Sequence, residues 1–298
     1  MPTPSLRGVY LPLITPFESD GSVALGAIER LAHECLDAGA AGLVPLGTTG
    51  ESPLLDAAEK RSIVELCAAI GRERDVHVIV GVGTNNTPNT IAAAESLAEV
   101  PGVTHALVVV PYYVRPSQAG IVAHMKAVAA ASPVPVVLYN IPARTGRVLE
   151  TAAMLELANT SNIAGVKQSV DGVDMPTLEL LAGAPRDFAV LGGEDAYLLS
   201  ITYLGGAGAI CASAHVCTER FVAEFECGVA GKVEEGRAHH EALLPVVQAC
   251  FAEPNPSVFK AVLHAQGRIP TPDVRLPLVS ASDAARDRAL DAIAAAQA

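Results

Sequence analysis

The 298-residue chain is predicted to fold as a (β/α)8 TIM barrel followed by a C-terminal helical extension. Short apolar runs, often β-branched, recur along the chain, and each is continuous rather than alternating, as in strands buried on both faces. Stretches rich in Ala, Leu and Glu with helical spacing lie between them. This strand-then-helix unit repeats about eight times, which favours a closed barrel over an open, doubly wound sheet.

The expected strands start at intervals of roughly 20–35 residues. They are residues 8–13, 42–46, 76–82, 106–110, 134–139, 163–166, 188–191 and 208–211. Helical spacing is clearest at residues 27–38, 57–70, 90–99 and 119–131. Asp56 with Glu59 resembles a capping box before the second of these helices, and Thr87-Pro88 places proline at a first helical position.

The chain is expected to divide into a barrel at residues 1–217 and an extension at residues 218–298 that includes the last barrel helix. After Val216 the sequence has only helical character, broken at Pro254-Asn255-Pro256 and at residues 270–277. Without long linkers or repeats, this extension should pack on the barrel or on a partner subunit.

Composition excludes several classes of function. The formal charge is −12 and no block rich in Lys or Arg occurs, which argues against binding to nucleic acid or to an anionic membrane surface. The six cysteines form no CxxC pair and are predicted to be reduced thiols of a cytoplasmic protein. No signal peptide is visible, and the apolar runs are far shorter than a membrane span.

The chemistry should gather at the C-terminal ends of the barrel strands, where TIM-barrel active sites lie. Polar or reactive groups follow or occupy these ends: Gly47-Thr48-Thr49-Gly50-Glu51-Ser52, Pro111-Tyr112-Tyr113, Tyr139-Asn140 with Arg144, Lys167, Gly192-Gly193-Glu194-Asp195 and Ile210.

Lys167 is the most informative member of this set, because it is one of five lysines and closes an apolar run. In water such a lysine is ordinary, but in a dry pocket an amine can attack a carbonyl and form a Schiff base. A tyrosine flanked by hydroxyls, such as Tyr139 with Thr48, can carry the protons that imine formation requires. Thr49 could hold a substrate carboxylate, and Arg144 could bind a second one bidentately.

Each group also has an ordinary structural interpretation. The Gly47–Gly50 segment could be a tight turn or a phosphate cradle, Tyr112 and Tyr113 could be packing aromatics, and Arg144 could form a surface ion pair. All of these groups fall at the same end of the predicted barrel, which favours the catalytic interpretation.

Two other patterns are weaker. His215-Val216-Cys217 and His239-His240 lack a complete set of metal ligands, so no metal is expected. Gly205-Gly206-Ala207-Gly208 precedes a strand and is better explained as a helix C-cap and turn than as a phosphate loop.

Three motifs resemble those of a known family. In chain order they are Gly47-Thr48-Thr49-Gly50-Glu51, Tyr139-Asn140-Ile141-Pro142 and Gly165-Val166-Lys167. With them, residues 8–278 resemble the class I pyruvate-dependent aldolase family that includes dihydrodipicolinate synthase and N-acetylneuraminate lyase. Pro111-Tyr112-Tyr113, Arg144-Thr145-Gly146 and the segments at 253–256 and 275–278 look like the synthase branch.

The resemblance implies an enzyme of lysine and diaminopimelate biosynthesis that needs no cofactor beyond a covalent imine. Lys167 would form that imine with pyruvate, and Tyr139 would shuttle protons while hydrogen-bonded to Thr48. Tyr113 would complete the relay from a neighbouring subunit, so the chain should be a homo-oligomer, either a dimer or a tetramer.

The resemblance also implies the substrate contacts. Thr49 and nearby backbone would hold the pyruvate carboxylate, and Arg144 would bind the carboxylate of L-aspartate-4-semialdehyde. Gly193 and Ile210 would line the pocket.

The segment after the lysine departs from the synthase pattern. Synthases usually read Glu-Ala-Thr/Ser-Gly-Asn there, whereas this chain has Gln168-Ser169-Val170-Asp171-Gly172 in a segment expected to face the second substrate. A lyase or dehydratase for a 2-keto-3-deoxy sugar acid or N-acetylneuraminate therefore stays open. A non-catalytic sensor or binding scaffold is the third alternative, although such a role needs no proton relay.

A second departure concerns regulation. Lysine-inhibited members carry a histidine or a similar set on the second helix and a glutamate on the third. This chain has Ala57, Lys60 and Asn89 at those positions, which predicts weak or absent inhibition by lysine.

Overall fold

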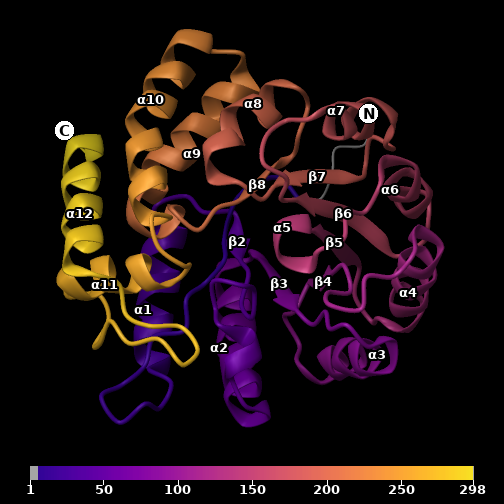
Figure 1. Ribbon diagram of the computed structural model, residues 1–298, viewed down its shortest axis with the longest axis horizontal. Helices are drawn as coiled ribbons and strands as arrows, with labels where there is room; N and C mark the ends of the chain where they lie inside the picture. Colours follow the sequence, from indigo (N-terminus) through magenta and orange to yellow (C-terminus); the bar gives the residue numbers. More distant parts are fainter. Residues whose placement is uncertain (1–5, 298) are drawn as a thin grey trace.

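The computed structural model describes residues 6–297 and contains a closed barrel of eight parallel strands. Neighbouring strands pair in chain order, and β8 returns to β1 through the pair Gly8 and Gly208. The predicted fold class is therefore confirmed (Figure 1). The strands are β1 (Gly8–Leu11), β2 (Gly42–Leu43), β3 (His77–Gly81), β4 (His105–Val109), β5 (Val136–Asn140), β6 (Ile163–Gln168), β7 (Ala189–Gly192) and β8 (Gly208–Ile210).

Helices surround the barrel and continue beyond it (Figure 1). They are α1 (Leu25–Asp37), α2 (Ala57–Arg74), α3 (Thr87–Glu95), α4 (Gln118–Ala131), α5 (Pro142–Thr145), α6 (Thr151–Ala158), α7 (Met175–Gly183), α8 (Leu198–Tyr203), α9 (Ala214–Ala230), α10 (Val233–Cys250), α11 (Ser257–Ala265) and α12 (Asp283–Gln297). Short 3-10 turns occur at η1 (Ser52–Leu54), η2 (Ser96–Glu99) and η3 (Asp195–Tyr197). None of the helices within residues 6–297 is both long enough and apolar enough to cross a bilayer.

The local helix signals behave largely as expected. Asp56 accepts a hydrogen bond from the Glu59 backbone N–H, and the Glu59 carboxylate accepts one from the Asp56 N–H, so the predicted capping box is present. At α3 the cap is Asn86, and Pro88 occupies the second helical position rather than the first. The Gly205–Gly208 segment forms the turn between α8 and β8, with a φ of 99° at Gly205.

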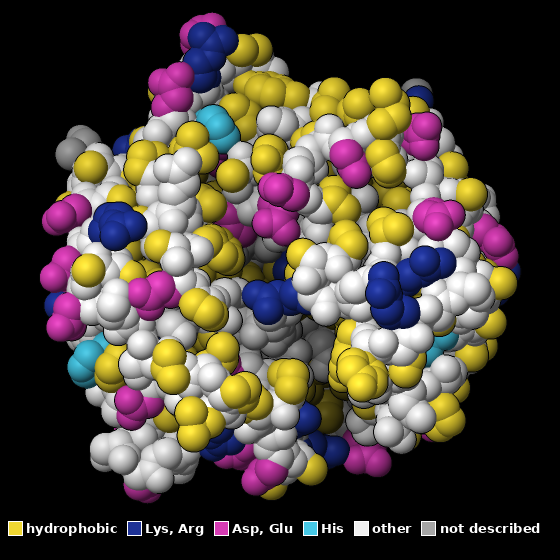
Figure 2. All heavy atoms as spheres, in the orientation of Figure 1, with side chains coloured by type: hydrophobic (Ala, Val, Ile, Leu, Met, Phe, Trp, Pro, Cys, Tyr) yellow, Lys and Arg dark blue, Asp and Glu magenta, His cyan; other side chains and the backbone are white. Residues whose placement is uncertain are grey.

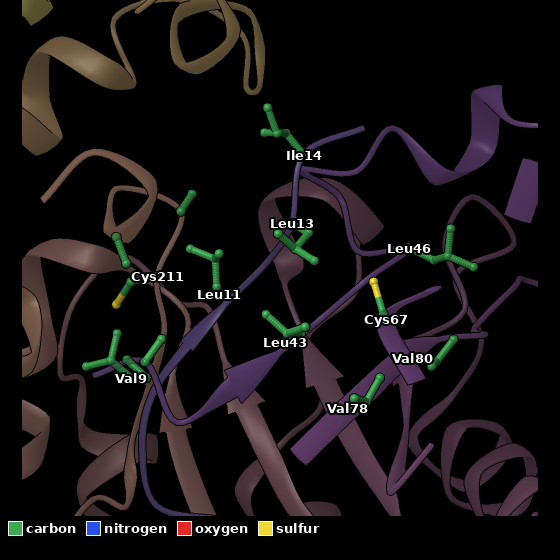
Figure 3. Packing of buried hydrophobic residues seen from close by; sticks show 14 of the residues in the cluster. Val9, Leu11, Leu13, Ile14, Leu43, Leu46, Cys67, Val78, Val80 and Cys211 are labelled. Atoms are coloured by element: carbon green, nitrogen blue, oxygen red, sulfur yellow. The ribbon is translucent and has the colours of Figure 1, made fainter. Parts of the chain in front are cut away.

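Strand alternation divides the buried residues into two cores, because successive side chains point to opposite faces. Inward-facing residues fill the barrel, and Tyr10, Ile79, Leu107 and Tyr139 belong to this inner cluster. Outward-facing residues pack between strands and helices; Figure 3 labels examples from β1, β2 and β3. Leu13, Ile14 and Leu46 extend this outer layer into the loops, so the expected strands at 8–13 and 42–46 are longer than the observed ones.

The C-terminal helices share the outer core of the barrel. Val246, Phe259 and Ile293 belong to the same buried cluster as the strand residues, and α12 packs against α10 and α11 (Figure 1). The expected breaks at 254–256 and 270–277 fall between helices. The last barrel helix, α9, begins at Ala214, a few residues before the expected boundary.

A buried ion pair joins the extension to the loop after β2. The Lys260 ammonium on α11 pairs with the Glu51 carboxylate, and both side chains are fully buried. The ammonium also donates to the Asp273 carbonyl (2.8 Å) and lies 4.0 Å from the centre of the Phe17 ring. Burial lowers the pKa of Lys260 to about 8, against the opposing effect of Glu51.

Arg275 ties the same loop down from a second direction. Its backbone N–H donates to Glu51 (2.9 Å), and its guanidinium reaches the Leu54 carbonyl (3.0 Å) and the Glu59 carboxylate (2.7 Å). The loop and the start of α2 are therefore held by residues more than two hundred positions away in the sequence.

Replacing Lys260 with methionine should destabilise the protein strongly. Lys260→Met leaves the buried Glu51 carboxylate without its counter-ion, and breaking such a pair costs about 3–5 kcal/mol. The loss is measured as the change in unfolding free energy in urea.

The matched control is Lys232→Met, because Lys232 pairs with Glu235 on the exposed surface. Exposed pairs contribute about 0–1 kcal/mol. Equal losses in the two variants would contradict the role assigned to the buried pair.

Candidate active site

Lys167 and Tyr139 lie side by side inside the barrel. They are register partners on β5 and β6, and Tyr139 belongs to the inner cluster of side chains. The Lys167 ammonium lies 4.6 Å from the centre of the Tyr139 ring, and both residues are less than 10 % exposed. A nucleophilic amine and a phenol that can exchange protons are thus placed together in a largely dry interior.

A cavity of about 360 Å³ at the C-terminal ends of the strands reaches Tyr139, whereas Lys167, Gly193 and Ile210 are not among its described lining residues. Tyr139 and Thr48 line it, Arg144 from α5 contributes a cation, and Leu107 and Val109 supply apolar wall. Figure 2 shows a hollow near the middle of this face with a dark blue cationic side chain at it, close to where Figure 1 draws α5 and β3. Apolar walls with a few convergent polar groups are typical of a small-molecule site.

The loop after β2 presents its two threonines differently. Thr48 faces the cavity, whereas Thr49 is buried and its hydroxyl accepts a hydrogen bond from Asn255 (3.0 Å). Within residues 6–297 no hydrogen bond joins Thr48 to Tyr139, so the bond implied by the family resemblance is not formed here.

The shape of this loop depends on contacts elsewhere. Leu46 and Glu51 adopt left-handed φ values of 59° and 54°, which cost free energy and persist only where surrounding contacts fix them. The Thr15 hydroxyl donates to the Gly50 carbonyl (2.7 Å), and the Glu51 ion pair holds the end of the loop.

Gly193 and Ile210 complete the interior around the lysine. A Cβ at Gly193 would lie 3.0 Å from Lys167 Cε, so only glycine lets the chain approach the lysine this closely. Ile210 is 1 % exposed and belongs to the inner cluster with Tyr139.

Two acidic residues follow Gly193. Burial and then the neighbouring Asp195 raise the pKa of Glu194 to about 7, while Lys167 and Arg144 oppose this shift. Asp195 is buried and accepts hydrogen bonds from the backbone of Ala212 (3.1 Å) and Ser213 (2.6 Å), which fixes the start of α9. Sequence reasoning gave Glu194 no role, although its place after β7 was a usable signal.

Tyr113 does not enter the site of its own chain. Its side chain is 88 % exposed and its backbone has a left-handed φ of 69°. Tyr112 lines the cavity instead.

Gln168 corrects one expectation. Its side chain points outward between β6 and α7, because it alternates with the inward-facing Lys167. Its carbonyl oxygen accepts from Asn140 (2.9 Å), and its amide donates to the Thr177 hydroxyl (3.1 Å). Gln168 therefore does not face a second substrate, although it belongs to the segment that was expected to do so.

Two of the histidines considered as metal ligands, His215 and His240, are used in protein contacts. His215 accepts from the Ile14 N–H (3.2 Å) and bonds the Ala212 carbonyl (2.8 Å), and His240 pairs with the buried Glu224 (3.0 Å). Residues 6–297 contain no group of three or more His, Cys, Asp or Glu side chains placed to hold a metal.

The extension supplies part of the cavity wall, which sequence reasoning did not assign. Asn255, Pro277 and Leu278 line the cavity beside Glu51. Their only sequence signal was the similarity of segments 253–256 and 275–278 to one branch of a family, which gives no position in space.

Comparison with known proteins agrees with this geometry. The sequence profile of the dihydrodipicolinate synthetase family matches residues 5–296. A 4-hydroxy-tetrahydrodipicolinate synthase of Moorella thermoacetica is 42% identical over 271 residues, covering 91% of each chain.

Solved structures show the same fold. A monomeric dihydrodipicolinate synthase variant matches with a TM-score of 0.93 and 31% identity, covering 98% of this chain and 97% of the other. The synthase of Cyanidioschyzon merolae with lysine bound matches with a TM-score of 0.93 and 32% identity, covering 98% of both chains.

Replacing Gln168 with alanine should lower stability without changing substrate preference. Gln168→Ala removes two buried hydrogen bonds, one accepted from Asn140 and one donated to Thr177, which costs about 1–3 kcal/mol. Urea denaturation measures the loss, and the relative rates with alternative aldehydes measure preference. A changed preference with unchanged stability would contradict this structural role.

Proposed function

The chain belongs to the dihydrodipicolinate synthetase family, and we propose that it condenses pyruvate with L-aspartate-4-semialdehyde as a 4-hydroxy-tetrahydrodipicolinate synthase. The main support for the proposal is that Lys167 and Tyr139 lie side by side inside the barrel, and that Arg144 lines the cavity that reaches Tyr139. Relatives near 40% identity that share one name add support, for example 42% in Moorella thermoacetica and 41% in Limosilactobacillus fermentum.

The first stage joins pyruvate to the enzyme. The neutral Lys167 amine attacks the ketone carbon of pyruvate, and the carbinolamine loses water to give an imine on that nitrogen. Water leaves only if its oxygen is protonated, and the adjacent Tyr139 phenol can supply that proton, which leaves a tyrosinate beside the protonated imine.

The second stage forms the carbon–carbon bond. Removal of a proton from the methyl carbon of the imine by Tyr139 gives an enamine, whose electron pair attacks the aldehyde carbon. The aldehyde oxygen takes the carbonyl π pair, and Tyr139 returns to it the proton taken from the methyl carbon. The amine of the former aldehyde substrate then attacks the imine carbon, which closes the ring and releases Lys167.

Charge complementarity supports the assignment of the second substrate. Arg144 lines the cavity and can bind a carboxylate through two parallel hydrogen bonds. We assign the carboxylate of pyruvate to the loop after β2, where Thr48 lines the cavity and Thr49, the partner expected from the sequence, is instead hydrogen-bonded to Asn255. A sugar acid would instead need neutral partners for its middle hydroxyls.

Trapping with borohydride tests the function. Incubating the protein with pyruvate and reducing it should attach one reduced pyruvyl group to Lys167, located by peptide mass spectrometry. A coupled assay with aspartate semialdehyde, 2-keto-3-deoxygluconate and N-acetylneuraminate should then give activity with the first alone. No adduct on Lys167 would overturn the proposal.

The proposal includes a homo-oligomer, a dimer or tetramer, in which Tyr113 of one subunit completes the relay of another. Its side chain is too exposed to serve its own site. The monomeric relative shows that the fold alone does not require assembly. A cytoplasmic location fits the six cysteines, all of which are buried and unpaired.

Mixing two inactive variants should restore activity. Lys167→Ala lacks the nucleophile and Tyr113→Phe lacks the phenol, so a hybrid assembly contains sites with an intact Lys167 and an intact Tyr113. Activity measured after mixing and refolding should exceed that of either variant alone. If Tyr113 acts within its own subunit, mixing restores nothing.

Lysine should inhibit the enzyme weakly or not at all. A surface hollow of about 520 Å³ between α2 and α3 is lined by Ala57, Lys60 and Arg61, and none of its described lining residues is acidic. An ammonium group would meet like charge there. Initial rates should be unchanged by sub-millimolar lysine, and clear inhibition in that range would contradict the expectation.

A further inference from the structure

The hydroxyl of Ser169 is buried beside the reactive lysine and has no partner. Ser169 is 2 % exposed, and among residues 6–297 its Oγ makes no hydrogen bond. Buried hydroxyls are nearly always bonded, because an unpaired one loses its interaction with water without compensation. An unpaired hydroxyl in an active site is therefore free to bond a substrate.

Strand alternation explains its direction. Ser169 follows β6 and its N–H still bonds the Asn140 carbonyl (2.8 Å), so the extended backbone continues through it. Lys167 and Ser169 are two residues apart and share the inward face, whereas Gln168 between them points outward into its own network.

The space next to Gly193 shows how close the side chains of Ser169 and Lys167 lie to each other. A Cβ built on Gly193 would lie 1.8 Å from Ser169 Oγ and 3.0 Å from Lys167 Cε. Both side chains therefore converge on one point over Gly193. Ser169 sits one step nearer the C-terminal mouth of the barrel than the lysine does.

The barrel topology separates this hydroxyl from the pyruvate carboxylate. Thr48 follows β2, and β2 lies opposite β6 in an eight-stranded barrel. Arg144 follows β5, the neighbour of β6. The second substrate, held at its carboxylate by Arg144, must therefore approach the imine on the side of Ser169.

Building on the proposed function, we propose that the Ser169 hydroxyl donates a hydrogen bond to the carbonyl oxygen of the acceptor aldehyde. As the enamine attacks, the carbonyl π pair moves to that oxygen. Ser169 keeps its proton and stabilises the developing negative charge, while Tyr139 delivers the proton taken from the methyl carbon. The same bond fixes which face of the aldehyde meets the enamine.

Ser169→Ala in the full-length enzyme tests this role. The kcat of condensation should fall about 10- to 100-fold, because one donor to a developing oxyanion is lost. The KM for the aldehyde should stay nearly constant, since Arg144 still binds its carboxylate. Borohydride trapping of pyruvate should be unchanged, because imine formation precedes the step that Ser169 serves.

A measurement of thermal stability distinguishes the proposed catalytic role of Ser169 from a structural one. Because Ser169 Oγ has no protein partner, Ser169→Ala should leave the thermal midpoint unchanged. Ser132→Ala is the matched control: that buried hydroxyl donates to the Val134 carbonyl (2.6 Å), so its loss should lower the midpoint and leave the kinetics intact.

Two results would overturn the inference. Condensation kinetics of Ser169→Ala equal to wild type would mean that the hydroxyl touches no reacting atom. Loss of pyruvate trapping in the variant would place Ser169 at the imine instead of the aldehyde. Failure of the proposed function itself would appear separately, as the absence of trapping or of condensation in the wild-type enzyme.

Discussion

The buried ion pair between Glu51 and Lys260 joins the loop after β2 to the C-terminal extension. Two charges without water persist only with close partners, and here Arg275 and the Asp273 carbonyl supply the remaining contacts. The pair fixes the end of a loop in which Leu46 and Glu51 have left-handed backbones. Thr48 faces the cavity from this loop, so the extension both lines the cavity and holds the loop that presents Thr48.

The period of the β-strand governs the chemistry inside the barrel. Lys167 and Tyr139 face inward on adjacent strands, whereas their successors Gln168 and Asn140 bond each other on the outside. In the proposed mechanism the inward side of the strand pair supplies proton transfer and imine formation, while the outward side links the two strands through hydrogen bonds. A one-residue shift in register would turn Lys167 and Tyr139 outward. The hydrogen bonds on the outward side therefore help to keep Lys167 and Tyr139 facing inward, although they touch no substrate.

The departure of this chain from the usual synthase sequence gains a different meaning in three dimensions. The Gln168 side chain does not indicate the second substrate, because its amide group is hydrogen-bonded to Asn140 and Thr177. Ser169 adds a free hydroxyl beside the lysine. Arg144 and Ser169 follow the neighbouring strands β5 and β6, whereas Thr48 follows β2 on the opposite side of the barrel.

Local sequence patterns were enough to predict the barrel, the capping box at Asp56 and the gathering of Lys167, Tyr139, Thr48 and Arg144 at one pole. These features follow from local periodicity and from the rule that parallel strands end on one face. Long-range packing was needed to show that Asn255 donates to Thr49, that Lys260 neutralises Glu51, and that the Tyr113 side chain is exposed. Those contacts join residues far apart in the chain, or depend on a backbone angle, and neither leaves a periodic signal in the sequence.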